Sequence, residues 1–202
     1  MAIALNDWLR DPSDPAPLID PLAGRHALAQ RRLTACFDGA FLDDPVRILR
    51  VFRFAVQLEF APDDALPALM RGAVAGLSRI AGERIREELL AIFETDRAAW
   101  AVASLNGLGA LDVLFPELIP GRDMDQGRFH HLDVLGHQLE TVAQADRILA
   151  DFAEFSEPLR HPLAAYCAEE LVERHSRKSL IKLSGLLHDV GKPSSRQIHE
   201  NG

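Results

Sequence analysis

Apolar residues recur every three or four positions along most of the chain, which is the spacing of one buried face of an α-helix. The first twenty residues differ, because two short apolar pieces, AIAL and APLID, flank the turn-forming RDPSDP and predict a short N-terminal β hairpin. Beyond Pro21 the pattern predicts helices at 25–31, 44–58, 64–73, 81–94, 97–105, 131–155, 158–173 and 178–189. The predicted fold class is therefore mainly α.

Composition narrows the classes of function. The chain has 202 residues, of which 48% are hydrophobic, and a formal net charge of -8. This acidic balance argues against a general nucleic-acid coat but allows a local basic patch. The two cysteines, Cys36 and Cys167, lie far apart without metal-type spacing, so we expect no disulfide and a reducing cytoplasmic location. No segment resembles a leader peptide or a membrane span, and we expect no membrane partner.

The stretch DDPVRILRVFRF at 43–54 combines acidic and basic residues within an apolar run. We predict Asp44 as the helix N-cap and Pro45 as the first helical residue, where a missing N–H costs nothing. Arg47, Arg50 and Arg53 then form one slanted cationic stripe, because a step of three residues turns the helix back by about 60°.

Such a stripe beside two carboxylates can read the edge of a nucleobase. Arginine donates to ring nitrogens and carbonyl oxygens, and a carboxylate accepts from an exocyclic amine. Cytosine and adenine both carry an amine beside an acceptor nitrogen. The residues alone leave a second interpretation open, in which the stripe is a solvated helix face with an Asp–Arg capping pair.

Three further segments agree in order and spacing with a known family. DDPVRILRVFRF resembles the nucleotide-recognition motif of class II tRNA nucleotidyltransferases (CCA-adding enzymes) and bacterial poly(A) polymerases. Before it, LIDPLAGRHALAQRRL resembles the family's Asp-Pro-x-x-Gly segment, although Ala23-Gly24 stands where the family has paired glycines. After it, ERIREELLAIF resembles the Glu-Arg helix, and NGLGALDVLFPEL resembles the body segment that follows.

The resemblance implies a role for each motif residue. Asp44 and Arg47 would pair with the Watson–Crick edge of incoming CTP or ATP, and Asp43 stands where the family usually has Glu. Arg50 and Arg53 would support phosphate or RNA contacts. In the Glu-Arg helix, the expected supporting residues that brace the recognition helix are Glu83 and Arg84, whose alternative is a surface ion pair.

The resemblance also implies a metal-dependent head. The family holds Mg²⁺ with an Asp-x-Asp pair on a strand, and this sequence has no such pair ahead of the arginine helix. MAIALN instead resembles the last strand of that head. We therefore expect the nucleotide- and RNA-binding part of an enzyme that adds CMP or AMP to the 3′ ends of tRNA or other RNA, and we expect no polymerisation by this chain alone.

A second group of chemistry-bearing residues lies in FHHLDVLGHQ and LLHDVGKP. These segments resemble the HD metal-dependent phosphohydrolase domain, which implies His137 as the first ligand and His188 and Asp189 as the central pair. Imidazole and carboxylate ligands suit Zn, Mn, Fe or Ni. A further ligating Asp should follow in a later helix. The implied substrate is a 2′,3′-cyclic phosphate at an RNA end.

We therefore expect three parts: residues 1–24 as a head-domain strand and linker, 25–119 as a neck and body helical region, and 120–202 as the first part of an HD-like helical domain. Two other functions stay open, an HD-type phosphohydrolase with a scaffold in front of it and a non-catalytic RNA-binding helical module. The sequence does not separate CCA addition from A-only or poly(A) addition, and it leaves the oligomeric state open.

Overall fold

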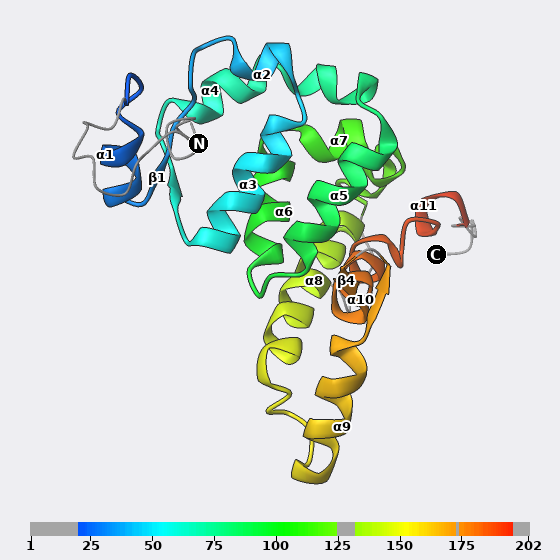
Figure 1. Cartoon of the computed structure of the whole chain (residues 1–202). Helices are drawn as coiled ribbons and strands as arrows, with labels where there is room; N and C mark the ends of the chain where they lie inside the picture. Colours follow the sequence, from blue (N-terminus) through cyan, green and yellow to red (C-terminus); the bar gives the residue numbers. More distant parts are fainter. Residues whose placement is uncertain (1–19, 125–131, 173, 196–202) are drawn as a thin grey trace, which may run out of the picture.

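The computed structural model describes residues 20–124, 132–172 and 174–195. The described part is mainly α, which confirms the predicted fold class (Figure 1). The predicted N-terminal hairpin falls on residues 1–19, outside the described residues. Within the described part, short strands form two pairs, neither of which the sequence pattern predicted.

The N-terminal half contains short helices around two longer ones. Its elements are α1 (Gly24–Ala29), β1 (Arg32–Leu33), α2 (Ala40–Asp43), α3 (Arg47–Leu58), β2 (Ala61–Pro62), α4 (Leu66–Arg71), η2 (Val74–Arg79) and α5 (Gly82–Phe93). β1 and β2 pair in parallel, with Arg32 opposite Ala61 and Leu33 opposite Pro62. This pair fastens the segment before α2 to the end of α3.

The C-terminal half includes the longest helix of the described residues, α8. Its elements are α6 (Ala98–Gly107), α7 (Ala110–Leu114), η3 (Pro116–Gly121), α8 (Val134–Asp151), α9 (Glu157–Ala168), β3 (Glu170–Val172), β4 (His175–Ser176), α10 (Arg177–Leu187) and α11 (Lys192–Ser195). β3 and β4 form an antiparallel pair. In Figure 1, α8 and α9 extend away from the body as a helical hairpin, opposite α1 and β1.

The helix α3 owes its position to one apolar face. Ile48, Leu49 and Phe52 are buried, and Ala55 and Val56 continue the same face one turn later. This spacing of three and four residues is that of an amphipathic helix against a core. The remaining faces carry the arginines, so the burial of the apolar residues decides where the arginines point.

One hydrophobic core runs through both halves of the chain. Leu135 and Val142 of α8 and Leu186 of α10 belong to the same buried cluster as Phe52 and Phe93. A smaller cluster of Leu149, Phe152 and Cys167 holds the α8–α9 hairpin together. The core crosses the boundary that we placed between residues 119 and 120, and that division stays a prediction.

A buried ion pair fixes α8 and α10 to the body. The Lys182 ammonium lies 2.7 Å from Asp146 Oδ1 and also donates to the carbonyl of Thr95. Asp146 Oδ2 accepts from the backbone N–H of Ala99 at 2.7 Å, which satisfies a free donor in the first turn of α6. Burial lowers the pKa of Lys182, and the carboxylate of Asp146 opposes that shift.

Two predicted helix starts need correction. Asp44 does not cap α3, because α3 begins at Arg47 with Val46 as its N-cap, and no side chain caps it. The Asp44–Val46 segment is a turn, and the Asp44 carboxylate is engaged by Arg84 instead. The helix predicted at 131–155 begins at Val134, since Asp133 caps it by accepting from the N–H of Gly136.

Candidate nucleotide site and metal cluster

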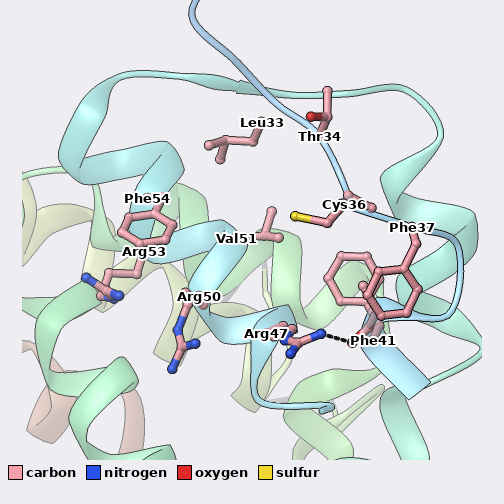
Figure 2. Close-up of a pocket in the computed structure, with 12 residues that line it drawn as sticks. Leu33, Thr34, Cys36, Phe37, Phe41, Arg47, Arg50, Val51, Arg53 and Phe54 are labelled. Atoms are coloured by element: carbon pink, nitrogen blue, oxygen red, sulfur yellow. Dashed lines mark hydrogen bonds between the residues drawn. The ribbon is translucent and has the colours of Figure 1, made fainter. Parts of the chain in front are cut away.

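The arginine stripe of α3 lines a cavity of about 540 Å³, here called the arginine cavity. Figure 2 shows the guanidinium groups of Arg47, Arg50 and Arg53 following one another along α3. The facing wall comes from the segment before α2 and from α2 itself, and the whole lining is Leu33, Thr34, Ala35, Cys36, Phe37, Ala40, Phe41, Arg47, Arg50, Val51, Arg53 and Phe54. The cavity thus combines cationic groups with aromatic and aliphatic walls.

Each arginine of the stripe is held in place by a partner. Arg47 donates through Nη1 to the carbonyl of Ala40 at 2.9 Å, which ties α3 to α2. Arg50 and Arg53 donate through Nε to the two carboxylate oxygens of Glu88, at 2.9 Å and 2.5 Å. Arg53 also lies over the ring of Phe54. The stripe is therefore a fixed set of donors and not a freely moving surface.

Asp44 does not line this cavity. Its Oδ2 accepts from Arg84 at 2.7 Å and lies 3.9 Å from Arg47 Nε. Its Oδ1 is buried and has no hydrogen-bond partner among the described residues. Burial would raise the pKa of this carboxyl, but Arg84, Arg47 and Arg50 outweigh it and hold the pKa below its usual value. Asp44 is thus ionised, with Oδ2 bound by Arg84 and Oδ1 enclosed by the protein.

The remaining predicted residues divide between exposed and bracing positions. Asp43 is exposed at the end of α2, outside the lining of the cavity. Glu83 is exposed in the first turn of α5, where a carboxylate stabilises a helix N-terminus. Arg84, in contrast, reaches from α5 to Asp44. The roles assigned to these residues in nucleotide binding stay predictions.

Sequence reasoning missed Glu88, which the structure places at the centre of the arginine stripe. The signal was present locally, because Ile85, Glu88 and Ile92 follow a spacing of three and four on α5. A carboxylate inside an apolar stripe predicts a buried charge that needs a cationic partner. Only the fold identifies that partner, since Arg50 and Arg53 lie more than thirty residues earlier in the chain.

A close contact also supports the turn before α3. A Cβ added at Gly76 would lie 2.5 Å from Cγ of Pro45, so η2 approaches the Asp44–Val46 turn as closely as a glycine allows.

The segment that resembles the family's Asp-Pro-x-x-Gly motif is held by its first residue. Asp20 accepts from the N–H groups of Gly24 and Arg25, and Ala23 adopts a left-handed backbone with φ 52°. A glycine would fit that conformation without strain.

The second predicted site comes together at the junction of α8 and α10. His137, His188 and Asp189, here called the His/Asp cluster, offer ligand atoms that all lie within 4.8 Å of one another. Asp189 Oδ2 lies 3.1 Å from His188 Nε2 and 3.6 Å from His137 Nε2. Two imidazole nitrogens and one carboxylate oxygen fit a divalent transition metal.

A lysine completes the surroundings of this cluster. Lys192 Nζ lies 2.6 Å from Asp189 Oδ2. Burial would raise the pKa of Asp189, but Lys192, His188 and His137 together lower it. The neighbouring Asp133 caps α8, and His130 and His131 lie outside the described residues.

Known tRNA nucleotidyltransferases are similar to this chain over most of its length. A family model described as "Probable RNA and SrmB-binding site of polymerase A" matches residues 59–121. An A-adding tRNA nucleotidyltransferase of Deinococcus radiodurans is 33% identical over 197 residues, which cover 95% of this chain and 38% of that protein. A CC-adding tRNA nucleotidyltransferase of Geobacter sulfurreducens is also 33% identical, over 88% of this chain and 38% of that protein. The chain thus spans a little over a third of the length of these relatives.

Solved structures share the fold at lower identity. A tRNA nucleotidyltransferase complexed with a primer tRNA and an incoming ATP analog superposes with a TM-score of 0.58 and 19% identity, covering 89% of this chain and 44% of that one. A Thermotoga maritima CCA-adding enzyme complexed with tRNA superposes with a TM-score of 0.53 and 20% identity, over 89% of this chain and 39% of that one. Over the region that it spans, the chain belongs to the class II tRNA nucleotidyltransferase and bacterial poly(A) polymerase family.

Proposed function

We propose that this chain holds the incoming nucleotide and the RNA 3′ end for a tRNA nucleotidyltransferase reaction that adds CMP or AMP. The observation that carries the proposal is the arginine cavity, in which Arg47, Arg50 and Arg53 face aromatic and aliphatic walls within a segment that matches the family. Guanidinium groups bind phosphate, and flat apolar walls accept a base. For Asp44 to accept from the amine of cytosine or adenine, as the resemblance implies, its buried Oδ1 would have to become accessible or Arg84 would have to release Oδ2.

The relatives do not decide which nucleotide is used. The A-adding and the CC-adding proteins are equally identical to this chain. Both cytosine and adenine present an amine beside an acceptor nitrogen, so one Asp–Arg pair serves both. We therefore propose CTP and ATP as ligands. We propose Mg²⁺ as the metal for the transfer step, held by head-domain carboxylates of the kind that the resemblance implies.

The partners follow from the same argument. The resemblance and the relatives both point to tRNA or another RNA as the acceptor. The described helices include none with the length and apolar character that a bilayer span requires. We propose a cytoplasmic protein, in line with its two free cysteines.

Equilibrium binding of CTP and ATP to the whole chain tests the proposal. Arg47→Ala should weaken both by at least about tenfold, since a charge-assisted hydrogen bond contributes about 1.5–3 kcal/mol. Arg71→Ala is the matched control, because Arg71 is an exposed arginine of α4 outside the cavity. Salt-sensitive tRNA binding without nucleotide binding would instead favour the RNA-binding module.

A second candidate function rests on the His/Asp cluster. We propose that His137, His188 and Asp189 bind a divalent transition metal of an HD-type phosphohydrolase. A metal bound there would supply activated water for attack on a phosphoester, such as a 2′,3′-cyclic phosphate. This chain's own residues contribute two neutral imidazoles and one carboxylate, and Lys192 would have to release Asp189 Oδ2 when a cation binds.

Metal titration tests this second function without an activity assay. The chain should bind one Mn²⁺ or Ni²⁺ ion. His188→Ala should lower the metal affinity by at least about tenfold, because even the loss of a residue that only supports a metal ligand lowers metal affinity by that factor. His161→Ala is the control, since His161 is an exposed histidine of α9. Equal binding by both variants and the wild type would show that the cluster is not the metal site.

A further inference from the structure

Glu88 contacts the arginine stripe in a way that leaves the outer edges of the guanidinium groups available. Both contacts use Nε, the inner nitrogen of each arginine, at 2.9 Å for Arg50 and 2.5 Å for Arg53. The terminal nitrogens of Arg50 have no hydrogen-bond partner that the described residues supply. Arg53 uses only Nη1 in addition, for a bond to Gln57. Both terminal nitrogens of Arg50 and Nη2 of Arg53 are thus uncommitted within the described part of the chain.

We propose that Glu88 is a positioning residue that aims Arg50 and Arg53 at the phosphates of the bound nucleotide. This inference rests on the proposed nucleotide-binding function and assigns the anion end of that site. Glu88 is only 7% exposed, so it acts through the two arginines and does not itself reach the ligand. Its role differs from that of Arg84, which holds Asp44 outside the lining of the cavity.

The physical reason is the cost of holding two cations side by side. Arg50 and Arg53 lie less than one helical turn apart, so their guanidinium groups repel each other and would separate into different rotamers. An arginine side chain also loses about 2 kcal/mol of rotamer entropy when it is fixed. One buried carboxylate that binds both Nε atoms offsets the repulsion and fixes both side chains before a ligand arrives.

The helix α5 sets the spacing of the whole site. Arg84 and Glu88 lie four residues apart on α5, so they face α3 from the same side of that helix. The first holds the acidic group that would accept from the base, and the second holds the cations that would bind the phosphates. One rigid helix therefore determines the distance between the base end and the phosphate end.

Charge alone and positioning predict opposite results when Glu88 is neutralised. Glu88→Gln makes the cavity more positive by one charge, so a purely electrostatic role predicts tighter binding of any anion. The positioning role predicts weaker binding, because a glutamine offers one acceptor oxygen where two are needed. The sign of the change in affinity therefore decides between them.

The experiment compares Glu88→Gln with Glu87→Gln in the whole chain. Both variants remove one negative charge from the same turn of α5, but Glu87 lies on the outer face beside Arg86 and His175. We expect Glu88→Gln to weaken inorganic triphosphate and CTP by about tenfold and Glu87→Gln to change neither by more than about twofold. Cytidine, which has no phosphate, should bind equally to both variants.

Two further measurements keep the result interpretable. Adding Glu88→Gln to Arg50→Gln should weaken triphosphate binding by less than Glu88→Gln does in the wild type, because only Arg53 then remains for Glu88 to position. Circular dichroism checks that each variant is folded at the temperature used. Unchanged or tighter triphosphate binding by folded Glu88→Gln would overturn the inference while leaving the proposed function in place. Failure of the wild type to bind CTP and ATP would overturn both.

Discussion

The arginine cavity and the His/Asp cluster are held in place by different parts of the fold. In the arginine cavity the polar groups are held by α5, because Glu88 contacts Arg50 of α3 and Arg84 contacts Asp44 in the turn before α3. In the His/Asp cluster the groups contact one another, and the added cation, Lys192, lies on the short helix α11 at the surface. The first site is a rigid set of hydrogen-bond donors. In the second site, His137, His188 and Lys192 all lie close to one oxygen, Asp189 Oδ2.

This difference matches the ligands proposed for the two sites. A nucleoside triphosphate is large and flexible, and a preorganised row of guanidinium groups reduces the cost of ordering it. A metal ion is small and brings its own charge, so the protein needs only to present ligand atoms at a common point. The buried pair of Lys182 and Asp146 joins α10 to α8, and its bonds to Thr95 and Ala99 hold both helices to the body.

The largest expected effect on stability comes from removing the Lys182–Asp146 ion pair. Lys182→Ala should lower the free energy of unfolding by about 3–5 kcal/mol, because it leaves Asp146 buried without its cationic partner. Lys178→Ala, one turn earlier, removes an exposed pair with Asp96 and should cost less than about 1 kcal/mol. Urea unfolding followed by circular dichroism measures both, and equal losses would contradict the structural role of Lys182.

A smaller change should affect the arginine cavity and not the His/Asp cluster. Gly76→Ala places a methyl group against Pro45, and we expect a loss of about 1–3 kcal/mol from overpacking. Since Pro45 precedes α3, CTP binding should weaken as well, while metal binding should not change. Gly107→Ala is the control, because a Cβ there meets no atom within 4 Å. Loss of metal affinity in Gly76→Ala would show that the two sites are not held independently.

A third change should stabilise the chain without touching either site. Ala23 has a left-handed backbone, so Ala23→Gly should raise the free energy of unfolding by up to about 1 kcal/mol. Ala75→Gly is the contrasting control, since Ala75 has no left-handed backbone and should lose stability. Thermal unfolding distinguishes the two, and a loss of stability in Ala23→Gly would contradict the assigned turn.

The smallest effect is a pH dependence of the contact between Asp44 and Arg84. The folded pKa of Asp44 lies below its unfolded value near 3.8, so its contribution to stability is complete above that pH and is lost as the pH falls through the folded pKa. Asp44→Asn should therefore show a shallower loss of stability between pH 5 and about pH 2 than the wild type. Parallel curves for the two proteins would contradict the contact.

The helices were largely predictable from sequence, while the roles of the predicted site residues stay predictions. Periodic apolar residues predicted the helices α3, α5, α8 and α10. The structure also brings His137 close to His188 and Asp189, although they lie about fifty residues apart in the chain. The resemblance supplied that second result, since spacing alone does not bring two distant helices together. The same resemblance supplied the order of the motifs.

The pairing of charges was not predictable. Asp44 satisfies the local rule for a helix cap, yet a long-range partner, Arg84, takes its carboxylate and the helix starts three residues later. The partners of Arg50 and Arg53 depend on which face of α5 meets α3, and that is decided by the burial of Ile92, Leu89 and Phe52. The parallel contact of β1 and β2 likewise has no local sequence signal, because each strand has two residues.

The central claim is that Arg47, next to Asp44, selects cytosine and adenine in the arginine cavity. Competition binding of CTP, ATP, GTP and UTP to the wild type and to Arg47→Ala tests it most directly. We expect the wild type to prefer CTP and ATP, and Arg47→Ala to bind all four nucleotides weakly and alike. An unchanged preference for CTP and ATP in folded Arg47→Ala would contradict it.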